Sequence, residues 1–347
     1  MLDKQENEDL AEPLLTTSKY DVEKSERTKN DASLSFPWWV GWDNGVVCGI
    51  IAAVAMSIHV LCAKLLEGHV PGHEIAFSRA VLCFIFSVVL AWLIHLHPMF
   101  GHLKNSPLMA LRGLFGAASV VTHYMSLFRM NVVTHYMSLF SLPIADAVLL
   151  NCLHPLLAAL AAWLLFGEAF GLRDAIGGML ALSGLFLLGS NSATPPGNER
   201  DYNNTRLYGL LTGLASTSLA IGGALCVKMI GDREHALSIA IWFHLLVSIT
   251  SGVPVFLSWH SAQGMPYPTV WEMEMMILIA IMSFIAQLFA TRSLQLLPVY
   301  LALCFTFLSV ALTYAYGLCV FHESVSTSGL SGAALIAMGV FISVHRR

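Results

Sequence analysis

Ionisable and polar side chains lie within long hydrophobic runs of this 347-residue chain. Such groups are costly inside a bilayer, so they usually face a cavity, a water path or a charged partner. A cation there could bind a carboxylate or phosphate, and Arg can do so through two parallel hydrogen bonds. These side chains are therefore suited to the reversible binding of a polar solute. The candidate binding residues are Lys64, Arg79, Tyr136, Asn151, His154, Lys228, Arg292, Tyr300 and Thr306.

The cations among these candidates each have a second interpretation. Lys64 and Lys228 occupy matching places near the ends of two hydrophobic runs, where they could contact an anion or extend to the membrane interface. Arg79 could bind a solute anion, or could pair with Asp146 or Glu74 to hold helices together. Both interpretations remain open from the sequence.

Histidines in the hydrophobic runs could move a proton. The imidazole titrates near neutral pH, so His135 and His154 are candidates for proton coupling, although a hydrogen-bonded core histidine is the commoner case. His154 precedes a proline, which frees a backbone carbonyl for polar partners. The lesser candidates for the solute path are His59, His244 and Gln287.

Three carboxylates are expected to have structural roles. Glu168 and Glu323 each end a hydrophobic run. Because negative charge is disfavoured at a helix C-terminus, we expect both to cap the start of the following helix. Asp146 is the third, as a partner for a cation. Proton coupling is the alternative for the two glutamates.

Several motifs of enzymes and metal sites do not occur in the sequence. The phosphate loop GxxxxGK, the zinc motif HExxH, the pair CxxC and the nucleophile elbow GxSxG are all missing. The seven cysteines lie singly in apolar runs, which is typical of buried thiols. We therefore expect no catalytic activity, no cofactor, no metal and no nucleic-acid partner.

The composition places these residues in a membrane. Hydrophobic residues make up 56% of the chain and charged residues only 12%, about half the usual share in soluble domains. A helix needs about 20 apolar residues to cross the hydrocarbon core. The runs long enough to do so lie at about 46–66, 74–96, 108–130, 143–166, 171–190, 206–228, 236–259, 272–295, 298–321 and 326–345.

The hydrophobic part of the chain contains an internal sequence repeat. The segment from Leu142-Pro143 to Glu168 has the same length and the same ends as the segment from Leu297-Pro298 to Glu323, 155 residues later. At that offset, Gly177 and Gly184 coincide with Gly332 and Gly339, a pattern that also favours close helix packing. Because five helices per copy is an odd number, the copies insert in opposite orientations, as in inverted-repeat transporters. The fold class is therefore all-α, with ten transmembrane helices in two inverted repeats.

The domain boundaries follow from this repeat. Residues 1–42 are polar and mixed in charge, so we expect a disordered cytosolic tail. The first repeat spans 43–191, a non-cytosolic linker spans 192–205, and the second repeat spans 206–347. Lys and Arg are enriched in the loops on one side, which predicts an integral multi-pass protein with both termini in the cytosol.

A second, shorter repeat lies in the third-helix region. The nonamer VVTHYMSLF occurs twice within 120–140, at a spacing of 12 residues. An in-frame duplication or an error in the gene model would explain it, and a functional doubling of the His-Tyr pair is the alternative.

Three segments carry a resemblance to a known family. KLLEGHVPGHEIAFSRAVL at 64–82, RGLFGAAS at 112–119 and LPIADAVLLNCLHPLLAALAAWLLFGE at 142–168 are similar to the first four helices of EamA-type proteins. Over about residues 45–345 the chain resembles the drug/metabolite transporter superfamily, nearest to the solute-carrier branch related to nucleotide-sugar transporters. Arg112 and Pro143 lie 31 residues apart, 12 more than the family's usual spacing, so the excess equals one copy of the duplication.

These observations predict a secondary transporter of a small polar or anionic organic metabolite that works by alternating access. The solute site would lie between helices one to four and six to nine, and a proton or an exchanged solute would supply the energy. Helices five and ten would pack at the periphery, where they could form a homodimer. One alternative is a nucleotide-sugar or phosphorylated-metabolite antiporter of an internal membrane. Another is a non-transporting scaffold or receptor, in which every intramembrane charge would be paired.

Overall fold

The computed structural model describes residues 41–66, 69–70, 72–127, 154, 157–167, 171–189, 199–261, 268–320 and 327–344. It divides the chain into two units, Met1–Asp43 and Asn44–Arg347, and the second contains the helices described below. Several residues singled out from the sequence lie outside the described part: His135, Tyr136, Asp146, Asn151, Glu168 and Glu323.

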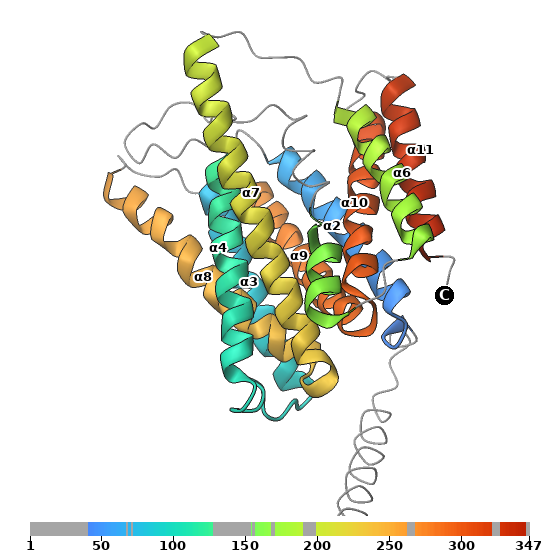
Figure 1. Ribbon diagram of the computed structural model, residues 1–347. Helices are drawn as coiled ribbons and strands as arrows, with labels where there is room; N and C mark the ends of the chain where they lie inside the picture. Colours follow the sequence, from blue (N-terminus) through green and yellow to red (C-terminus); the bar gives the residue numbers. More distant parts are fainter. Residues whose placement is uncertain are drawn as a thin grey trace, which may run out of the picture. The chain divides into compact units, whose positions relative to one another are not determined.

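Long helices make up the second unit, and the described residues contain no strand (Figure 1). Their order along the chain is α2 (Gly45–Leu65), α3 (Gly72–Leu93), α4 (Ser106–Leu127), α6 (Leu172–Gly189), α7 (Glu199–Ile230), the short 3-10 helix η2 (Gly231–Arg233), α8 (Ala236–Ser261), α9 (Val270–Leu296), α10 (Val299–Val320) and α11 (Thr327–Val344). A further helical stretch, Leu157–Phe166, lies between α4 and α6. These segments coincide with the predicted runs and differ from them mainly at the ends.

Five of the described helices are long and apolar enough to cross a membrane by length and composition. They are Gly45–Leu65, Glu74–Leu93, Leu214–Arg233, Ala236–Val253 and Val270–Leu296. Side-chain caps at the starts of α2 and α9 use the free backbone N–H groups of the first turn. Asn44 Oδ1 accepts from the N–H groups of Val46 and Val47 at 3.0 and 3.3 Å, and Thr269 forms a reciprocal capping box with Glu272 at the start of α9.

The helix starts show the repeat in register. The starts of α3 and α8, and the starts of α4 and α9, lie 164 residues apart, as do Lys64 and Lys228. The starts of α6 and α11 lie 155 residues apart. The first repeat therefore holds nine more residues between its third and fifth helices than the second repeat does. The duplicated nonamer lies in that interval.

The packing of the helices has the symmetry expected of two inverted repeats. Helix α2 packs on α9, and its counterpart α7 packs on α4. Helix α3 packs on α9 as α8 packs on α4, while the pairs α3 with α8 and α6 with α11 are their own counterparts. If each helix is replaced by its counterpart in the other repeat, every one of these packed pairs becomes a pair that is also packed in the structure.

Glycines let the backbones of α6 and α11 meet. A Cβ atom on Gly177 would lie 2.6 Å from the carbonyl oxygen of Gly339, and one on Gly184 would lie 2.5 Å from that of Gly332. Ala181 lies between the two contacts and is almost completely buried. Small residues allow such close approach in membrane helices. The packing predicted from these glycines is confirmed.

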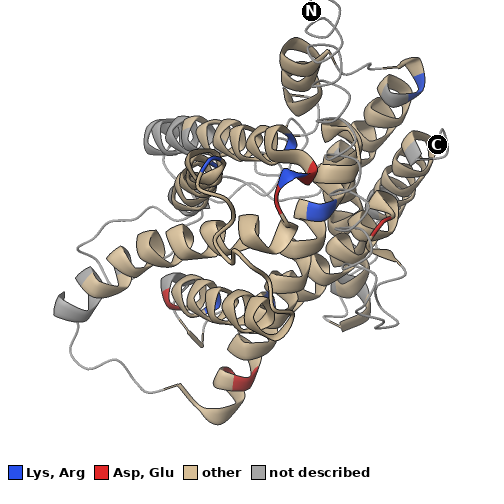
Figure 2. Cartoon of the chain, turned by 90° about the horizontal axis from the view of Figure 1, so that it is seen from below, with Lys and Arg blue, Asp and Glu red and all other residues tan. Residues whose placement is uncertain are grey.

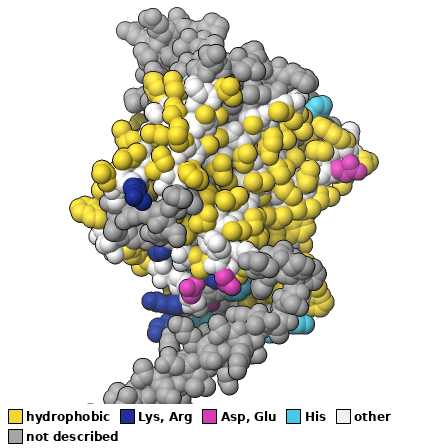
Figure 3. All heavy atoms as spheres, turned by 90° about the vertical axis from the view of Figure 1, so that its right-hand side faces the viewer, with side chains coloured by type: hydrophobic (Ala, Val, Ile, Leu, Met, Phe, Trp, Pro, Cys, Tyr) yellow, Lys and Arg dark blue, Asp and Glu magenta, His cyan; other side chains and the backbone are white. Residues whose placement is uncertain are grey.

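The outer surface of the bundle is apolar. Large hydrophobic side chains are exposed on most helices, with Trp92, Phe256 and Phe341 among the most exposed. Figure 3 shows one face with a broad band of hydrophobic side chains, and most of the charged side chains visible there lie below this band. Seen from the end that carries the loop between α3 and α4, the described helices bear few charged residues (Figure 2). This distribution suits a surrounding of lipid chains.

Candidate functional site

A cationic side chain lies buried between three helices. Arg112 on α4 is 8% exposed, and its guanidinium carbon lies 4.6 Å from the ring centroid of Phe243 on α8. Glycines provide the space, because a Cβ atom on Gly116 or on Gly223 would lie 2.7 or 3.0 Å from Arg112 Nη1. The buried Nε–H has no hydrogen-bond partner among the described residues. A guanidinium stays charged in proteins, so this site holds a positive charge with an unused donor.

A second guanidinium lies on α3, which packs on α8 as α4 does. Arg79 on α3 is half-buried, and its Nη1 donates to Ser283 Oγ on α9 over 3.5 Å, at the long limit for a hydrogen bond. Within the part of the chain that the structure describes, neither Arg79 nor Arg112 forms an ion pair with an acidic side chain. The two arginines therefore present uncompensated positive charge there.

Two histidines lie within electrostatic range of these cations. Arg79 acts on the imidazoles of His59 on α2 and His244 on α8, and Arg112 acts on His244 as well. The ring atoms His59 Nδ1 and His244 Nε2 are buried and have no hydrogen-bond partner among the described residues. His244 packs against Phe284 on α9. We call Arg79, Arg112, His59 and His244, with the adjacent Phe243 and Phe284, the cationic zone; its side chains come from α2, α3, α4, α8 and α9.

This zone has the chemistry of an anion site. A buried charge is unfavourable unless a partner compensates it. A carboxylate or phosphate could accept from the two guanidinium groups and from imidazole N–H groups. The sequence pointed to Arg79, with His59 and His244 as lesser candidates, but treated Arg112 only as part of a family motif. Its position six residues inside a transmembrane helix was the signal that could have identified it.

The lysines predicted to bind solute lie at opposite ends of the bundle. Lys228 is near the end of α7, and its Nζ donates to the carbonyl oxygen of Leu297 over 2.7 Å. Lys64 is exposed in the last turn of α2. Matched positions of an inverted repeat lie at opposite ends by construction, so the structure does not bring these two side chains together.

The remaining described candidates are dispersed. Arg292 pairs with the exposed Asp232 at 2.9 Å, which links α9 to η2. Tyr300 is buried in the hydrophobic core, and the hydroxyl of the exposed Thr306 donates to the Leu303 carbonyl of its own helix. His154 Nε2 is buried without a hydrogen-bond partner among the described residues. The roles suggested for these residues stay predictions.

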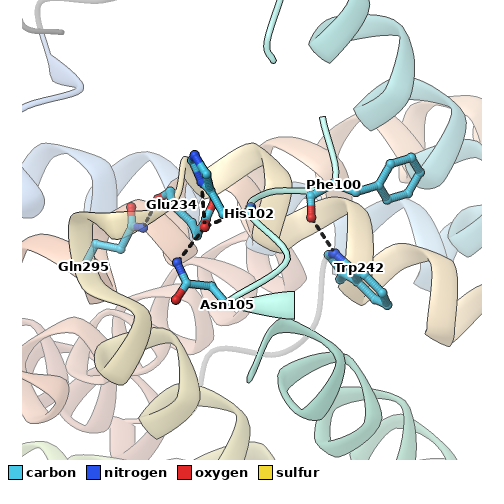
Figure 4. Close-up of polar contacts among 6 residues, drawn as sticks. All are labelled: Phe100, His102, Asn105, Glu234, Trp242 and Gln295. Carbon is cyan, nitrogen blue, oxygen red and sulfur yellow. Dashed lines mark hydrogen bonds and ion pairs between the residues drawn. The ribbon is translucent and has the colours of Figure 1, made fainter. Parts of the chain in front are cut away.

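A polar cluster that the sequence did not reveal joins the two repeats at one end. Glu234, between η2 and α8, has a carboxylate that is 3% exposed. Its Oε1 accepts from Asn105 Nδ2 at 2.7 Å and from the backbone N–H of His102 at 3.1 Å, and His102 Nδ1 lies at the same distance. Gln295 Nε2 donates to the backbone oxygen of Glu234 at 2.9 Å. Figure 4 shows these side chains converging on Glu234.

The loop between α3 and α4 is shaped to reach this carboxylate. Gly101 has a φ of 72°, which favours glycine, and a Cβ atom there would lie 2.8 Å from Glu234 Oε2. Beside it, Trp242 Nε1 on α8 donates to the carbonyl oxygen of Phe100 over 3.0 Å (Figure 4). The loop of the first repeat is therefore held to the second repeat by both side-chain and backbone hydrogen bonds.

An all-α bundle with inverted helix pairs, an apolar outer surface and cations inside has the architecture of a multi-pass membrane transporter. The comparisons with known proteins agree. Residues 43–190 match the model of the EamA-like transporter family. This match and the relatives described below support the EamA-type drug/metabolite transporter superfamily, the one that the sequence resembles.

Curated relatives are named as transporters. The chain is 20% identical over 295 residues to the pseudopaline exporter CntI of Pseudomonas aeruginosa, covering 85% of this chain and 94% of the exporter. It is 21% identical over 300 residues to solute carrier family 35 member G1 of Mus musculus, covering 84% and 75%. A crystal structure with 16% sequence identity superposes with a TM-score of 0.67 over 87% of this chain and 96% of the other, which supports the fold.

Proposed function

We propose that the protein is a secondary transporter that carries a small organic anion across the membrane by alternating access between its two repeats. The observation that carries this proposal is the pair of arginines inside the bundle, Arg79 and Arg112, without an acidic partner among the described residues. A solute carboxylate or phosphate would supply the missing charge.

The energetic argument favours binding over a purely structural role. A hydrogen bond to a charged group contributes about 1.5 to 3 kcal/mol. An anion that accepts from both guanidinium groups would therefore gain several kcal/mol, and it would remove the penalty of the uncompensated charges. Phe243 and Phe284 offer apolar contact to the remainder of an organic solute. Inorganic ions would not use that contact.

Two alternatives differ from this proposal in a testable way. A scaffold or receptor would need its intramembrane charges paired, and the buried Arg112 Nε–H, which has no hydrogen-bond partner among the described residues, does not suit it. A nucleotide-sugar or phosphorylated-metabolite antiporter would use the same arginines but requires exchange. His154 and His135 stay our candidates for proton coupling, and both termini are proposed to be cytosolic. A homodimer through α6 and α11 is also a proposal.

Uptake into proteoliposomes tests the function. Purified protein is reconstituted and offered labelled mono-, di- and tricarboxylates, sugar phosphates and nucleotide sugars, with and without a pH gradient or a counter-solute inside. We expect saturable uptake of at least one organic anion, and a strong loss in Arg79→Ala. Arg173→Ala, an exposed position on α6, is the matched control and should transport normally. Absence of uptake for the whole panel by folded protein, or preference for cations, would contradict the proposal.

A further inference from the structure

Two polar contacts join the first repeat to the second repeat near helix ends. Each contact pairs a glutamate of the second repeat with a histidine in a loop of the first repeat. We name the contact of Glu234 with His102 and Asn105 the Glu234 latch. We name the contact of His69, which follows α2, with Glu272 and Trp271 in the first turn of α9 the Glu272 latch. In the second, His69 Nδ1 lies 3.8 Å from Glu272 Oε1, and its ring packs edge-on against Trp271 with 5.4 Å between centroids.

The repeat relates the two latches to each other. Asn105 directly precedes α4, and Thr269, 164 residues later, directly precedes α9. The loops that meet these helix starts follow α7 and α2, which are also counterparts. The two latches differ in which side carries the glutamate. In the Glu234 latch the glutamate is in the loop after α7, and the histidine is in the loop before α4. In the Glu272 latch the histidine is in the loop after α2, and the glutamate is at the start of α9.

The latches lie at opposite ends of the bundle. Glu272 is in the first turn of α9, whereas Gln295, near the last residue of the same helix, donates to the Glu234 backbone oxygen. The offset of 23 positions from Glu272 to Gln295 corresponds to about 35 Å of α-helix. That length is comparable with the thickness of a hydrocarbon core, about 30 Å.

The bonding differs between the two ends. The Glu234 carboxylate is 3% exposed and has three polar partners from the first repeat's loop. The Glu272 carboxylate is 13% exposed, and its Oε2 accepts from the Thr269 N–H at 2.6 Å, whereas His69 Nδ1 lies 3.8 Å from Oε1, beyond hydrogen-bond distance. Of the two described latches, the Glu234 latch is held by hydrogen bonds, and the Glu272 latch by a looser electrostatic and ring contact.

We propose that these latches are the two gates of the transport cycle, and that opening one end breaks its latch while the other stays closed. This inference rests on the proposed alternating access. With the termini in the cytosol, the Glu234 latch closes the cytosolic end and the Glu272 latch the opposite end. Weakening one latch must then raise the population that is open at that end and lower the population open at the other.

Conservative substitutions weaken each latch separately. Glu234→Gln keeps the shape but removes the charge that strengthens the bonds to Asn105 and His102. Glu272→Gln removes the charge that faces His69 and preserves the capping box, because Gln also serves at that position. Glu274→Gln is the matched control, since Glu274 is an exposed residue of the same helix.

Two native cysteines on α2 report on the two ends. Cys48 is fully buried in the first turn of α2, beside the contact of Gly45 with Leu297. Cys62 is 5% exposed and packs with Leu66 and Ile279 near the Glu272 latch. Labelling of the full-length protein with a soluble maleimide, followed by mass spectrometry, measures the reaction rate of each thiol.

We expect Glu234→Gln to raise the labelling rate of Cys48 by about tenfold, the order given by one lost charged hydrogen bond, and to lower that of Cys62. Glu272→Gln should do the reverse, with a smaller change. Equal changes at both thiols, or none in either variant, would overturn the proposal; size-exclusion profiles and melting curves identify a variant that has merely loosened. The labelling needs no solute, so a protein with reciprocal labelling but no uptake would refute the proposed function and leave the gates standing.

Discussion

Replacement of Arg112 by methionine separates a binding role from a structural one. Methionine has a similar length and is apolar, so it fills the space between Phe243, Gly116 and Gly223 without a charge. The substitution loses a cation–π contact, about 2 kcal/mol when desolvated. It also removes a buried, uncompensated charge, and replacing buried ionic groups with apolar ones is often stabilising by about 1 to 4 kcal/mol.

The two terms nearly offset each other, so we expect the stability of the solute-free variant to differ from that of the parent by about −1 to +2 kcal/mol. Solute binding, in contrast, should become weaker. If Arg112 donates two charge-assisted hydrogen bonds to the solute, their loss costs about 3 to 6 kcal/mol, which raises the apparent KM at least about 100-fold. The signature is a protein of nearly unchanged stability that transports poorly.

Two measurements on the same preparation test this signature. Thermal unfolding in detergent gives the change in Tm with and without the solute, and proteoliposome uptake gives KM and maximal rate. A bound solute should raise the Tm of the parent and have little effect on the variant. The reasoning is refuted if Arg112→Met lowers the Tm by many degrees, or if it transports with an unchanged KM, because Arg112 would then be a packing residue.

Three further predictions concern other contacts. Gly339→Leu should destabilise the protein by about 3 kcal/mol or more, because its side chain would overlap the Gly177 backbone; an unchanged melting curve would show that α6 and α11 are not in contact. Lys228→Met should cost about 1.5 to 3 kcal/mol by losing the donor to Leu297, with a lower Tm as the readout and Lys228→Arg as a partial rescue. Trp242→Phe keeps the aromatic ring but loses the bond to the Phe100 carbonyl, about 1 kcal/mol; faster hydrogen exchange in the loop between α3 and α4 would support it, and unchanged exchange would not.

Much of the fold could be predicted from local patterns. The hydrophobic runs located α2 to α4 and α6 to α11 because transfer of an apolar helix into hydrocarbon depends on the residues of that segment alone. The spacing of glycines on α6 and α11 predicted their close packing for the same reason, since a helix places residues at fixed offsets on one face. The repeat, in turn, predicted inverted pairing.

The candidate site was predictable only in part. Arg79 stood out as an intramembrane charge, but its nearest described polar contact, Ser283, is 204 residues away in the chain. The bonds of Glu234 to His102 and Asn105 span 132 and 129 residues. No spacing rule connects residues in different loops, because their meeting depends on how the helices between them pack.

The sequence by itself predicted a multi-pass helical membrane protein with two inverted copies of one unit, since hydrophobicity, helix periodicity and repetition are properties of the linear chain. Only the tertiary structure decided which charges are compensated. It separated Lys64 from Lys228, paired Arg292 with Asp232, left Arg112 without an acidic partner among the described residues and placed Glu234 between the repeats. The physical reason is that the energy of a charge depends on its neighbours in space.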